Sequence, residues 1–318
     1  MAVNNSLQAN NRQNFIENGM AFSAYLSQDA VKRKVNDVIG GRDGQRFISA
    51  IVSATTANPA LQECTNSSIL SAAMLGESLK LSPSPQLGQY YLVPYNDKEQ
   101  GKVAQFQLGY KGYVQLALRS GQYRKLNVMA IKAGELIRFD PLNEEIEVRL
   151  IEDEEEREKA ETAGYYAMFE YTNGFRKAMY WSKEKMITHA DKFSMAFSKA
   201  GKTVKGKYGD KKKVSYADYL AGNYDPKDSW MYSSFWYKDF DAMAYKTMLR
   251  QLISKWGIMS IDMQQAMDAD MGVIRNDGTV DYVDNQHTSE AEIVEAETEV
   301  VQPEPAGNSD AVQQALFG

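Results

Sequence analysis

The chain has 318 residues, of which 43% are hydrophobic and 25% are charged, and its formal net charge is −6. This length and apolar content are enough for a full hydrophobic core, in one large domain or two small ones. The single cysteine, Cys64, excludes an intramolecular disulfide bond, and no apolar run approaches the roughly 20 residues of a membrane-spanning helix. Because the N-terminus is polar and lacks a signal-peptide pattern, we expect a cytoplasmic protein without a membrane partner.

The charge is distributed unevenly along the chain. Residues 270–318 hold eleven acidic residues and one basic residue, and residues 144–161 hold ten acidic and three basic ones. Residues 176–213 hold twelve basic and three acidic residues. A basic segment of this density is typical of a polyanion-binding surface, so the negative total does not exclude a nucleic-acid partner. A solvated, lysine-rich loop is the alternative that charge alone leaves open.

Helical periodicity dominates the first 80 residues. Residues 1–26, polar at their start, are expected to form an N-terminal arm. Ser27 is a candidate N-cap of a helix that ends at Gly40-Gly41, because the apolar residues between them recur at helical spacing. Two further apolar runs, at 47–52 and 69–74, repeat this spacing. The sequence therefore predicts a helical N-terminal part.

The next part of the chain changes to the two-residue period of β-strands. Apolar residues alternate with glutamines over 104–108, and this segment is expected to pair with 90–95 across the polar turn 96–102. The pattern from Lys111 to Ser120 then predicts a short helix that ends at Gly121.

Further strands follow this helix. Alternation over 146–150 predicts one strand, and the apolar segments 165–171 and 175–181 predict two more. The last two flank Asn173-Gly174, which is the strongest short-range signal for a β-hairpin. The sheet is therefore expected to be mostly antiparallel.

The C-terminal part is expected to be helical up to an acidic tail. The helical pattern returns at Ser182 and includes one long helix over 229–255. Residues 270–318 are acidic, lack periodicity and predict a disordered tail. Helices, then a mostly antiparallel sheet with an embedded helix, then helices again indicate an α+β fold, with one folded domain over 27–269.

Residues suited to catalysis are scarce. The only histidines are His189 and His287, so neither a His-based triad nor a His-rich metal site can be assembled. The acidic run 152–158 is contiguous, whereas the carboxylates of a metal site converge from separate elements. Gly201-Lys202-Thr203 lacks the first glycine of a phosphate-binding loop, since Ala196 stands there. We therefore expect no catalytic residue, no metal, no cofactor and no use of ATP.

Two segments resemble a known protein family. Residues 79–95, LKLSPSPQLGQYYLVPY, and residues 108–113, LGYKGY, resemble the signature of the RecT family, phage and prophage proteins that anneal single-stranded DNA without ATP. Trp236, the run MAYKT at 243–247 and Arg250 resemble a second pattern of the same family. Two matches in the same order are more specific than either one alone.

The resemblance extends over residues 27–262, and it departs from the family before Ser260, where a proline is often found. We interpret this departure as a changed helix exit. The resemblance implies a protein that is not an enzyme and that promotes DNA recombination and repair by annealing complementary strands. It also implies a positively charged groove in a curved or helical homo-oligomer, so that residues 27–269 would bind DNA, anneal it and oligomerise.

The resemblance also implies partners. They are single-stranded DNA, the annealed duplex and a phage exonuclease that generates the single strand. Beyond the resemblance, a host single-strand-binding protein is a further expected partner. Two other functions are compatible with the same basic and aromatic content. A passive single-strand-binding protein would protect strands without accelerating their pairing, and a metal-dependent nuclease would shorten them.

The candidate DNA contacts are cations and flat side chains, which can hold phosphates and sugars and leave base edges free. Gly109-Tyr110-Lys111-Gly112 suits this role, because glycines let a backbone approach a phosphate. Lys111, Gln115 and Arg119 fall at i, i+4 and i+8 of the predicted helix and form one polar stripe. An ordinary amphipathic helix after a tight turn is the alternative.

Lys246 and Arg250 are four residues apart and share a face of the predicted long helix. On the residues alone they are an exposed basic pair, and the resemblance favours a DNA contact. The candidate DNA-binding residues are Gln105, Gln107, Tyr110, Lys111, Gln115, Arg119, Arg124, Lys125, Lys199, Lys202, Lys205, Lys207, Lys246 and Arg250. Residues expected in the core instead are Cys64, Trp181, Trp230, Trp236 and Trp256.

The acidic segments have open roles. The tail 270–318 either competes with DNA for the basic groove or docks a host partner through Leu316-Phe317, and a solubilising tail without a partner is the alternative. The segment 144–161 either faces away from DNA or pairs with the basic surface of a neighbouring subunit.

Overall fold

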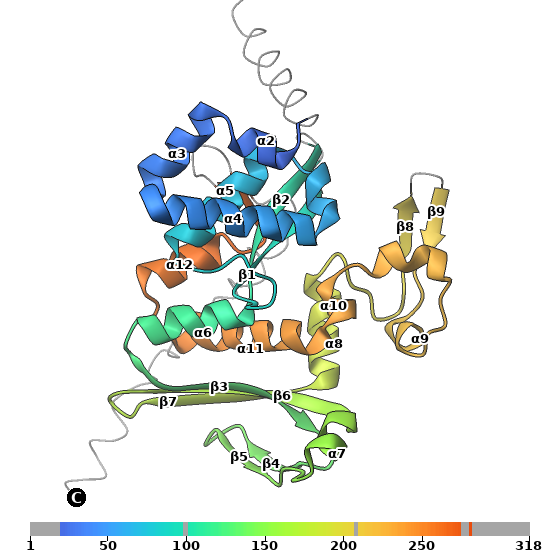
Figure 1. The fold of residues 1–318 in the computed structure, drawn as a ribbon. Helices are drawn as coiled ribbons and strands as arrows, with labels where there is room; N and C mark the ends of the chain where they lie inside the picture. Colours follow the sequence, from blue (N-terminus) through green and yellow to red (C-terminus); the bar gives the residue numbers. More distant parts are fainter. Residues whose placement is uncertain (1–19, 98–100, 207–208, 275–279, 282–318) are drawn as a thin grey trace, which may run out of the picture. The chain divides into compact units, whose positions relative to one another are not determined.

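Helices dominate the N-terminal part of the fold (Figure 1). The computed structural model describes residues 20–97, 101–206, 209–274 and 280–281. Its first elements are α2 (Phe22–Leu26), α3 (Asp29–Ile39), α4 (Gly41–Ala57), the 3-10 helix η1 (Pro59–Glu63) and α5 (Asn66–Ser78). The three helices predicted in this part are confirmed as α3, α4 and α5, and Gly40 ends α3 with a φ of 81°.

The folded part begins earlier than predicted. Phe22 and Leu26 on α2 are 8% and 3% exposed and belong to the main hydrophobic core, although they lie inside the predicted arm 1–26. Ser27 does not cap α3, because its hydroxyl donates to the carbonyl of Ser23 at 2.9 Å and Gln28 occupies the N-cap position. A helix of five residues is too short to show a period, which is why the sequence did not predict α2. Residues 1–19 of the predicted arm lie outside the described residues.

The first sheet is a hairpin that a later segment extends. β1 (Tyr90–Asp97) and β2 (Gly101–Leu108) pair antiparallel, with Tyr90 opposite Leu108, as predicted. β10 (Gly272–Ile274) pairs with the other edge of β2, and β11 (Val280–Asp281) pairs with β10. α5 packs against this sheet.

The second sheet holds three antiparallel strands in the order β3 (Tyr123–Lys132), β6 (Thr162–Tyr171) and β7 (Arg176–Ser182). β6 and β7 form the hairpin predicted around Asn173-Gly174, and Gly174 has a φ of 87°. Along β6, successive side chains point to opposite faces. Tyr165 and Phe169 enter the main core, whereas Tyr166 and Met168 enter a second, smaller cluster.

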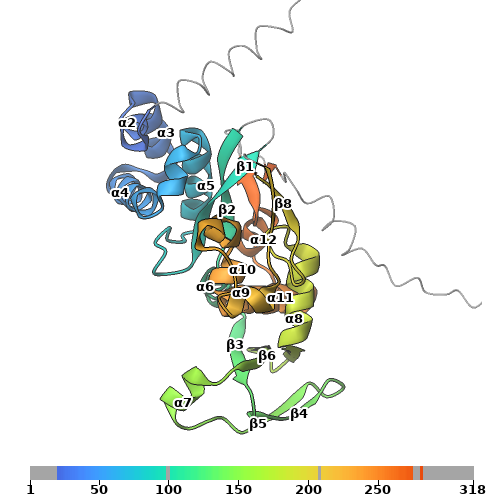
Figure 2. The ribbon, with the colours of Figure 1, turned by 90° about the vertical axis from the view of Figure 1, so that its right-hand side faces the viewer.

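Different elements cover the two faces of this sheet. α8 (Lys183–Phe193) and α11 (Phe240–Trp256) pack on the main-core face. The hairpin β4 (Leu136–Asp140) and β5 (Glu145–Val148) contributes to the second cluster and lies on the other side, as Figure 2 shows. β5 confirms the strand predicted over 146–150.

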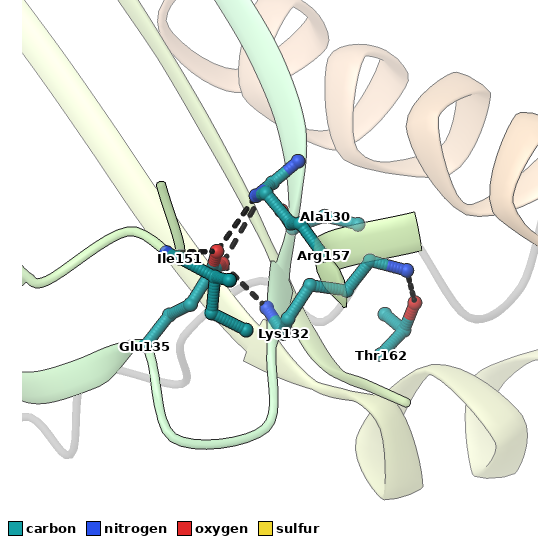
Figure 3. Close-up of polar contacts among 6 residues, drawn as sticks. All are labelled: Ala130, Lys132, Glu135, Ile151, Arg157 and Thr162. Atoms are coloured by element: carbon teal, nitrogen blue, oxygen red, sulfur yellow. Dashed lines mark hydrogen bonds and ion pairs between the residues drawn. The ribbon is translucent and has the colours of Figure 1, made fainter. Parts of the chain in front are cut away.

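A buried ion pair joins the acidic segment to the sheet (Figure 3). The carboxylate of Glu135 is fully buried, and Nε of Arg157 on α7 (Glu154–Lys159) lies 2.6 Å from it. The same carboxylate accepts the backbone N–H of Lys132 at 2.8 Å and that of Ile151 at 3.2 Å. Burial acts to raise the pKa of Glu135, but these hydrogen bonds outweigh it and hold the pKa below its usual value. The acidic residues of 152–158 are all exposed and form a solvated face.

The C-terminal helices are shorter and more numerous than predicted. After the hairpin β8 (Thr203–Gly206) and β9 (Gly209–Lys212) come α9 (Tyr216–Leu220), η2 (Pro226–Tyr232), α10 (Phe235–Lys238), α11 and α12 (Ile261–Asp268). The long helix predicted over 229–255 is confirmed for 240–255 as α11, but its predicted start is wrong, because η2 and α10 occupy that segment. The hydroxyl of Ser234 accepts the N–H of Trp236, and the carboxylate of Asp239 accepts the N–H of Ala242 at 3.1 Å. Each of these N-caps starts a new helix, and the chain bends between them.

The predicted α+β class is confirmed, and the remaining core predictions are confirmed in part. Cys64 is buried at the end of η1, and burial raises the pKa of its thiol to about 11. Trp236 is buried and Trp181 is half-buried, but Trp230 and Trp256 are 48% and 43% exposed. Those two predictions are wrong because the helices that carry these residues present them to solvent. None of the described helices combines the length and apolar character that crossing a bilayer requires.

Candidate nucleic-acid interface

The two segments that carry the family resemblance meet in the structure. α6 (Tyr110–Arg119) packs against α11, and the two helices lie side by side in Figure 1. The rings of Tyr110 and Tyr245 are 5.5 Å apart in an edge-to-face contact. The ring of Tyr91 on β1 lies 5.2 Å from that of Phe235 on α10, which is 37% exposed. Rings from four separate elements therefore gather around the start of α6.

The glycines of this region serve backbone packing. The N–H of Gly109 donates to the carbonyl of Gln89 at 2.8 Å. A Cβ at Gly109 would overlap the carbonyl oxygen of Gly88, and a Cβ at Gly112 would overlap that of Gln89. The close approach that these two glycines permit in the structure is to the backbone of Gly88 and Gln89. They let α6 approach the segment before β1, and this contact positions Tyr110 and Lys111.

The polar stripe of α6 faces solvent. Lys111, Gln115 and Arg119 are exposed, and the opposite face of the helix is buried through Tyr113 and Leu116. The ammonium of Lys111 lies 6.0 Å from the ring centroid of Tyr110. Arg119 donates from Nη2 to the carbonyl of Leu79 at 2.5 Å, so its guanidinium is partly engaged within the chain. Lys111 is the cation of this stripe with the greatest freedom to meet a phosphate.

The basic pair on α11 is tied to a buried carboxylate. Nζ of Lys246 lies 2.8 Å from Oδ1 of Asp270, and Nη1 of Arg250 lies 3.1 Å from Oδ2. Oδ1 also accepts the backbone N–H of Leu108 at 2.9 Å. The side chain of Asp270 is fully buried, that of Lys246 is 9% exposed and that of Arg250 is 35% exposed. The two residues share a face as predicted, but Lys246 is not an exposed cation.

Burial of Lys246 acts to lower its pKa, and the attraction of Asp270 only partly opposes this effect. Asp270 was not identifiable from the sequence, because a single aspartate after an amphipathic helix has no distinctive pattern. The same holds for Phe235, whereas Tyr91 and Tyr245 lie within the two quoted segments and were identifiable from them.

Other candidates on the two sheets are more engaged than predicted. Gln105 is 7% exposed, because it lies in β2 between two neighbouring strands, and Gln107 is half-buried. Arg124 and Lys125 are exposed, but both approach the carboxylate of Glu170, at 3.1 and 3.9 Å.

Two of the four candidates in the basic segment 176–213 also have partners within the chain. Lys199 pairs with Glu184, and Nζ of Lys202 donates to the carbonyl of Met195. The side chain of Lys205, on β8, and the whole of Lys207 lie outside the described residues. Thr203 begins strand β8, so Gly201-Lys202-Thr203 does not lead into the helix that a phosphate-binding loop requires.

Groups with catalytic potential are few in this region. His189 lies on α8 next to the rings of Trp181 and Phe193, at 5.2 and 4.5 Å. Burial, followed by the nearby cations, lowers the pKa of His189 to about 4, so its imidazole is neutral near pH 7. Among the described residues no three His, Cys, Asp or Glu side chains lie together in a way that would hold a metal ion.

Comparison with known proteins identifies the family of this chain. A model of the RecT family matches residues 45–282, which include both segments around α6 and α11. An uncharacterized protein of Bacillus subtilis, YqaK, is 36% identical over 316 residues, which cover 98% of this chain and 90% of that protein. Protein RecT of Escherichia coli is 26% identical over 251 residues, which cover 78% of this chain and 79% of that protein. The chain belongs to the RecT family.

Proposed function

We propose that this protein anneals complementary single strands of DNA without ATP and thereby promotes homologous recombination. Membership of the RecT family supports a role in single-strand annealing and recombination. The observation that carries the proposal is the meeting of both family segments at one place, where the exposed Lys111 lies beside a group of aromatic rings.

Such a protein must bind single-stranded DNA independently of its base sequence. Phosphates are the same in every strand, and stacking on rings is tolerant of base identity. Lys111 and Gln115 supply polar groups on one exposed stripe, and Tyr110, Tyr91 and Phe235 supply ring faces or edges nearby. A strand held through its backbone in this way keeps base edges free for a complement, and base pairing then supplies the net free energy of annealing.

The candidate residues contribute to this proposal to different degrees. Lys111, Gln115 and Arg119 are exposed and can meet a strand directly. Arg124 and Lys125 would exchange the carboxylate of Glu170 for a phosphate. Lys246 and Arg250 would act chiefly through Asp270, which fixes the end of β2 just before Tyr110 and Lys111. Other contacts in the same proposal are Tyr110, Gln105, Gln107, Lys199, Lys202, Lys205 and Lys207.

The proposal extends to assembly and partners. In it the protein works in the cytoplasm as a homo-oligomer whose subunits align one positively charged groove along the strand. An exonuclease would generate the single strand, and a host single-strand-binding protein would deliver it. The exposed acidic residues of 152–158 support a groove placed elsewhere on the molecule, because like charge repels a phosphate backbone.

The pairing rate of two complementary labelled oligonucleotides, with and without protein and in the absence of nucleotide, tests this function. We expect faster pairing with both strands still at full length. Tight binding without faster pairing would indicate a passive single-strand-binding protein, and shortened strands that depend on divalent metal would indicate a nuclease. Either outcome would contradict the proposal.

A residue variant tests the phosphate grip. Lys111→Ala should weaken binding equally for all DNA sequences. It should also reduce the slope of log K against log salt concentration by about 0.7, which is the contribution of one phosphate contact with a single strand. Lys227→Ala is the matched control, because it removes an exposed lysine from η2. A loss confined to particular sequences would contradict a grip on the phosphates.

A further inference from the structure

One face of α8 carries an unusual band of cations and rings. Lys185, His189 and Lys192 follow one another at spacings of four and three, so they share a side of the helix. Trp181, at the end of β7, extends the band beyond the start of the helix, where the hydroxyl of Ser182 caps the N–H of Lys185. Together with Phe193 and with Lys255 from α11, these residues are called the α8 face below.

Two cations of the α8 face, Lys185 and Lys192, lie against its rings. Nζ of Lys185 is 4.5 Å from the ring centroid of Trp181, and Nζ of Lys192 is 5.2 Å from that of Phe193. His189 lies between them, in contact with both rings. Lys185 and Lys192 therefore each have an aromatic surface beside them. This combination suits an extended single strand, because the charge can bind the phosphate and the flat ring can bind the base or sugar.

Two helices contribute charge to this face. The cations that act on His189 are Lys185 and Lys192 of α8 together with Arg250 and Lys255 of α11. Lys185 and Lys192 lie on the same side of α8 as His189, and Arg250 and Lys255 add positive potential from α11. The neutral imidazole adds no repulsion of its own and fills the space between them. The α8 face is thus centred on Lys185 and Lys192, whose ammonium groups lie over Trp181 and Phe193.

No carboxylate of the described part of the chain pairs with the lysines of this face. Among the described residues, Lys185, Lys192 and Lys255 have no ion pair, and all three are exposed. The acids of α8 are directed to another lysine, because Glu184 pairs with Lys199 and Asp191 accepts the backbone N–H of Lys199 at 2.7 Å. An exposed set of cations whose neighbouring acids are engaged elsewhere is available to an external anion.

We propose that the α8 face is a second phosphate-binding surface, separate from Lys111 on α6, and that it holds the backbone of a nucleic-acid strand. This inference rests on the proposed function, since it assigns to the annealing protein a further contact with its DNA. The rings beside the lysines favour a nucleic acid over an acidic protein segment. Bases stack on aromatic rings, whereas carboxylates bind only the cations. An acidic surface of a second copy is the outcome that would replace it.

The test compares two variants with the same change of charge. The first is Lys185→Gln with Lys192→Gln and Lys255→Gln. The control is Lys32→Gln with Arg33→Gln and Lys34→Gln, three exposed cations of α3. The measurement is the affinity for a labelled oligo-dT strand as a function of salt concentration. Because each phosphate contact with a single strand contributes about 0.7 to the slope of log K against log salt, the first variant should flatten the slope by about 2.

The control should leave the slope near that of the unmodified protein. A slope of the first variant equal to that of the unmodified protein, or changed no more than that of the control, would overturn the proposal. A normal slope combined with altered subunit number in the absence of DNA would assign the α8 face to a contact between copies, and this too would overturn it.

A third variant separates charge from folding. Lys185→Arg with Lys192→Arg and Lys255→Arg keeps the cations, so the slope should return to that of the unmodified protein. A flattened slope in this variant as well would mean that the phosphates are not what the face recognises. If the unmodified protein binds strands but does not accelerate their pairing, the proposed function fails while the salt slopes still decide the role of the α8 face.

Discussion

A single carboxylate, Asp270, explains the arrangement of the basic pair on α11. It binds Lys246 and Arg250, accepts the amide of Leu108 at the end of β2, and is itself fully buried. Leu108 immediately precedes Gly109 and the start of α6. Asp270 therefore connects α11, the first sheet and the helix that presents Lys111, so we assign it a positioning role in the candidate interface.

Asp270→Asn should strongly destabilise the fold. The substitution keeps the shape but leaves the buried ammonium of Lys246 without its counter-charge, and removal of one partner of a buried pair costs about 3 to 5 kcal/mol. Urea unfolding measures the loss, and Asp268→Asn, an exposed position on α12, is the control. Adding Lys246→Met to Asp270→Asn should recover part of the loss, because the double variant has no unpaired lysine. A loss below about 1 kcal/mol for Asp270→Asn would contradict this account.

The helix face of Lys246 could be predicted from the sequence, but its burial could not. That Lys246 and Arg250 share a helix face follows from their spacing alone. That Lys246 is buried depends on Asp270, 24 residues later in the chain. The same holds for Arg157, which lies in an acidic run and yet is held by the buried Glu135, 22 residues before it. Partners at such separations leave no local pattern.

At the scale of elements, the sequence predicted those with a clear period or a distinctive turn. The hairpins β1–β2 and β6–β7 follow from alternation and from Asn173-Gly174. β3 escaped prediction because both faces of its sheet are covered and charged residues at its start interrupt the alternation. The long helix was predicted too long because N-caps act at single residues, such as Asp239, inside an otherwise helical segment.

The contact between α6 and the segment before β1 predicts opposite effects for two similar substitutions. In Gly112→Ala the new methyl group would overlap the carbonyl oxygen of Gln89, and the resulting strain should cost about 1 to 3 kcal/mol. In Gly44→Ala, on α4, the methyl group would meet only Oδ1 of the exposed Asn36, at 3.2 Å, and Val35 at 3.6 Å.

Because alanine favours a helix interior over glycine by about 1 kcal/mol, Gly44→Ala should be neutral or stabilising. Thermal unfolding of both variants gives the comparison, and strand binding shows whether the displaced α6 still presents Lys111. Equal stability of the two variants would mean that the close approach of α6 to Gln89 does not constrain the fold.

At the scale of the whole molecule, the charges are segregated. Residues 284–318 contain eight acidic residues and no lysine or arginine, so the rest of the chain is positive by 2. This segregation is readable from the sequence. The end of the fold is not readable from the sequence, because the acidic composition begins at Asp270 while the described strands continue to Asp281 at the end of β11. The domain boundary predicted at residue 269 from acidic composition is too early, since Asp270, Val273 and Ile274 are all buried.

Two truncated chains show whether residues 284–318 or residues 271–283 contribute to stability. A chain ending at Val283 keeps β10 and β11 and should unfold at the same urea concentration as the full chain. A chain ending at Asp270 loses Val273 and Ile274, which are 1% and 6% exposed, and the backbone bond from Met271 to Phe106. Burial of two such side chains contributes about 3 to 6 kcal/mol, so this chain should be much less stable.

The chain that ends at Val283 also tests the role of the acidic segment. If the segment competes with DNA for the cations, the chain ending at Val283 should bind a single strand more tightly than the full chain at 50 mM salt. The difference should shrink at higher salt, because screening weakens the internal competition and the DNA contact together. Unchanged affinity at every salt concentration would exclude competition and leave the segment as a solubilising tail or a docking site for a partner.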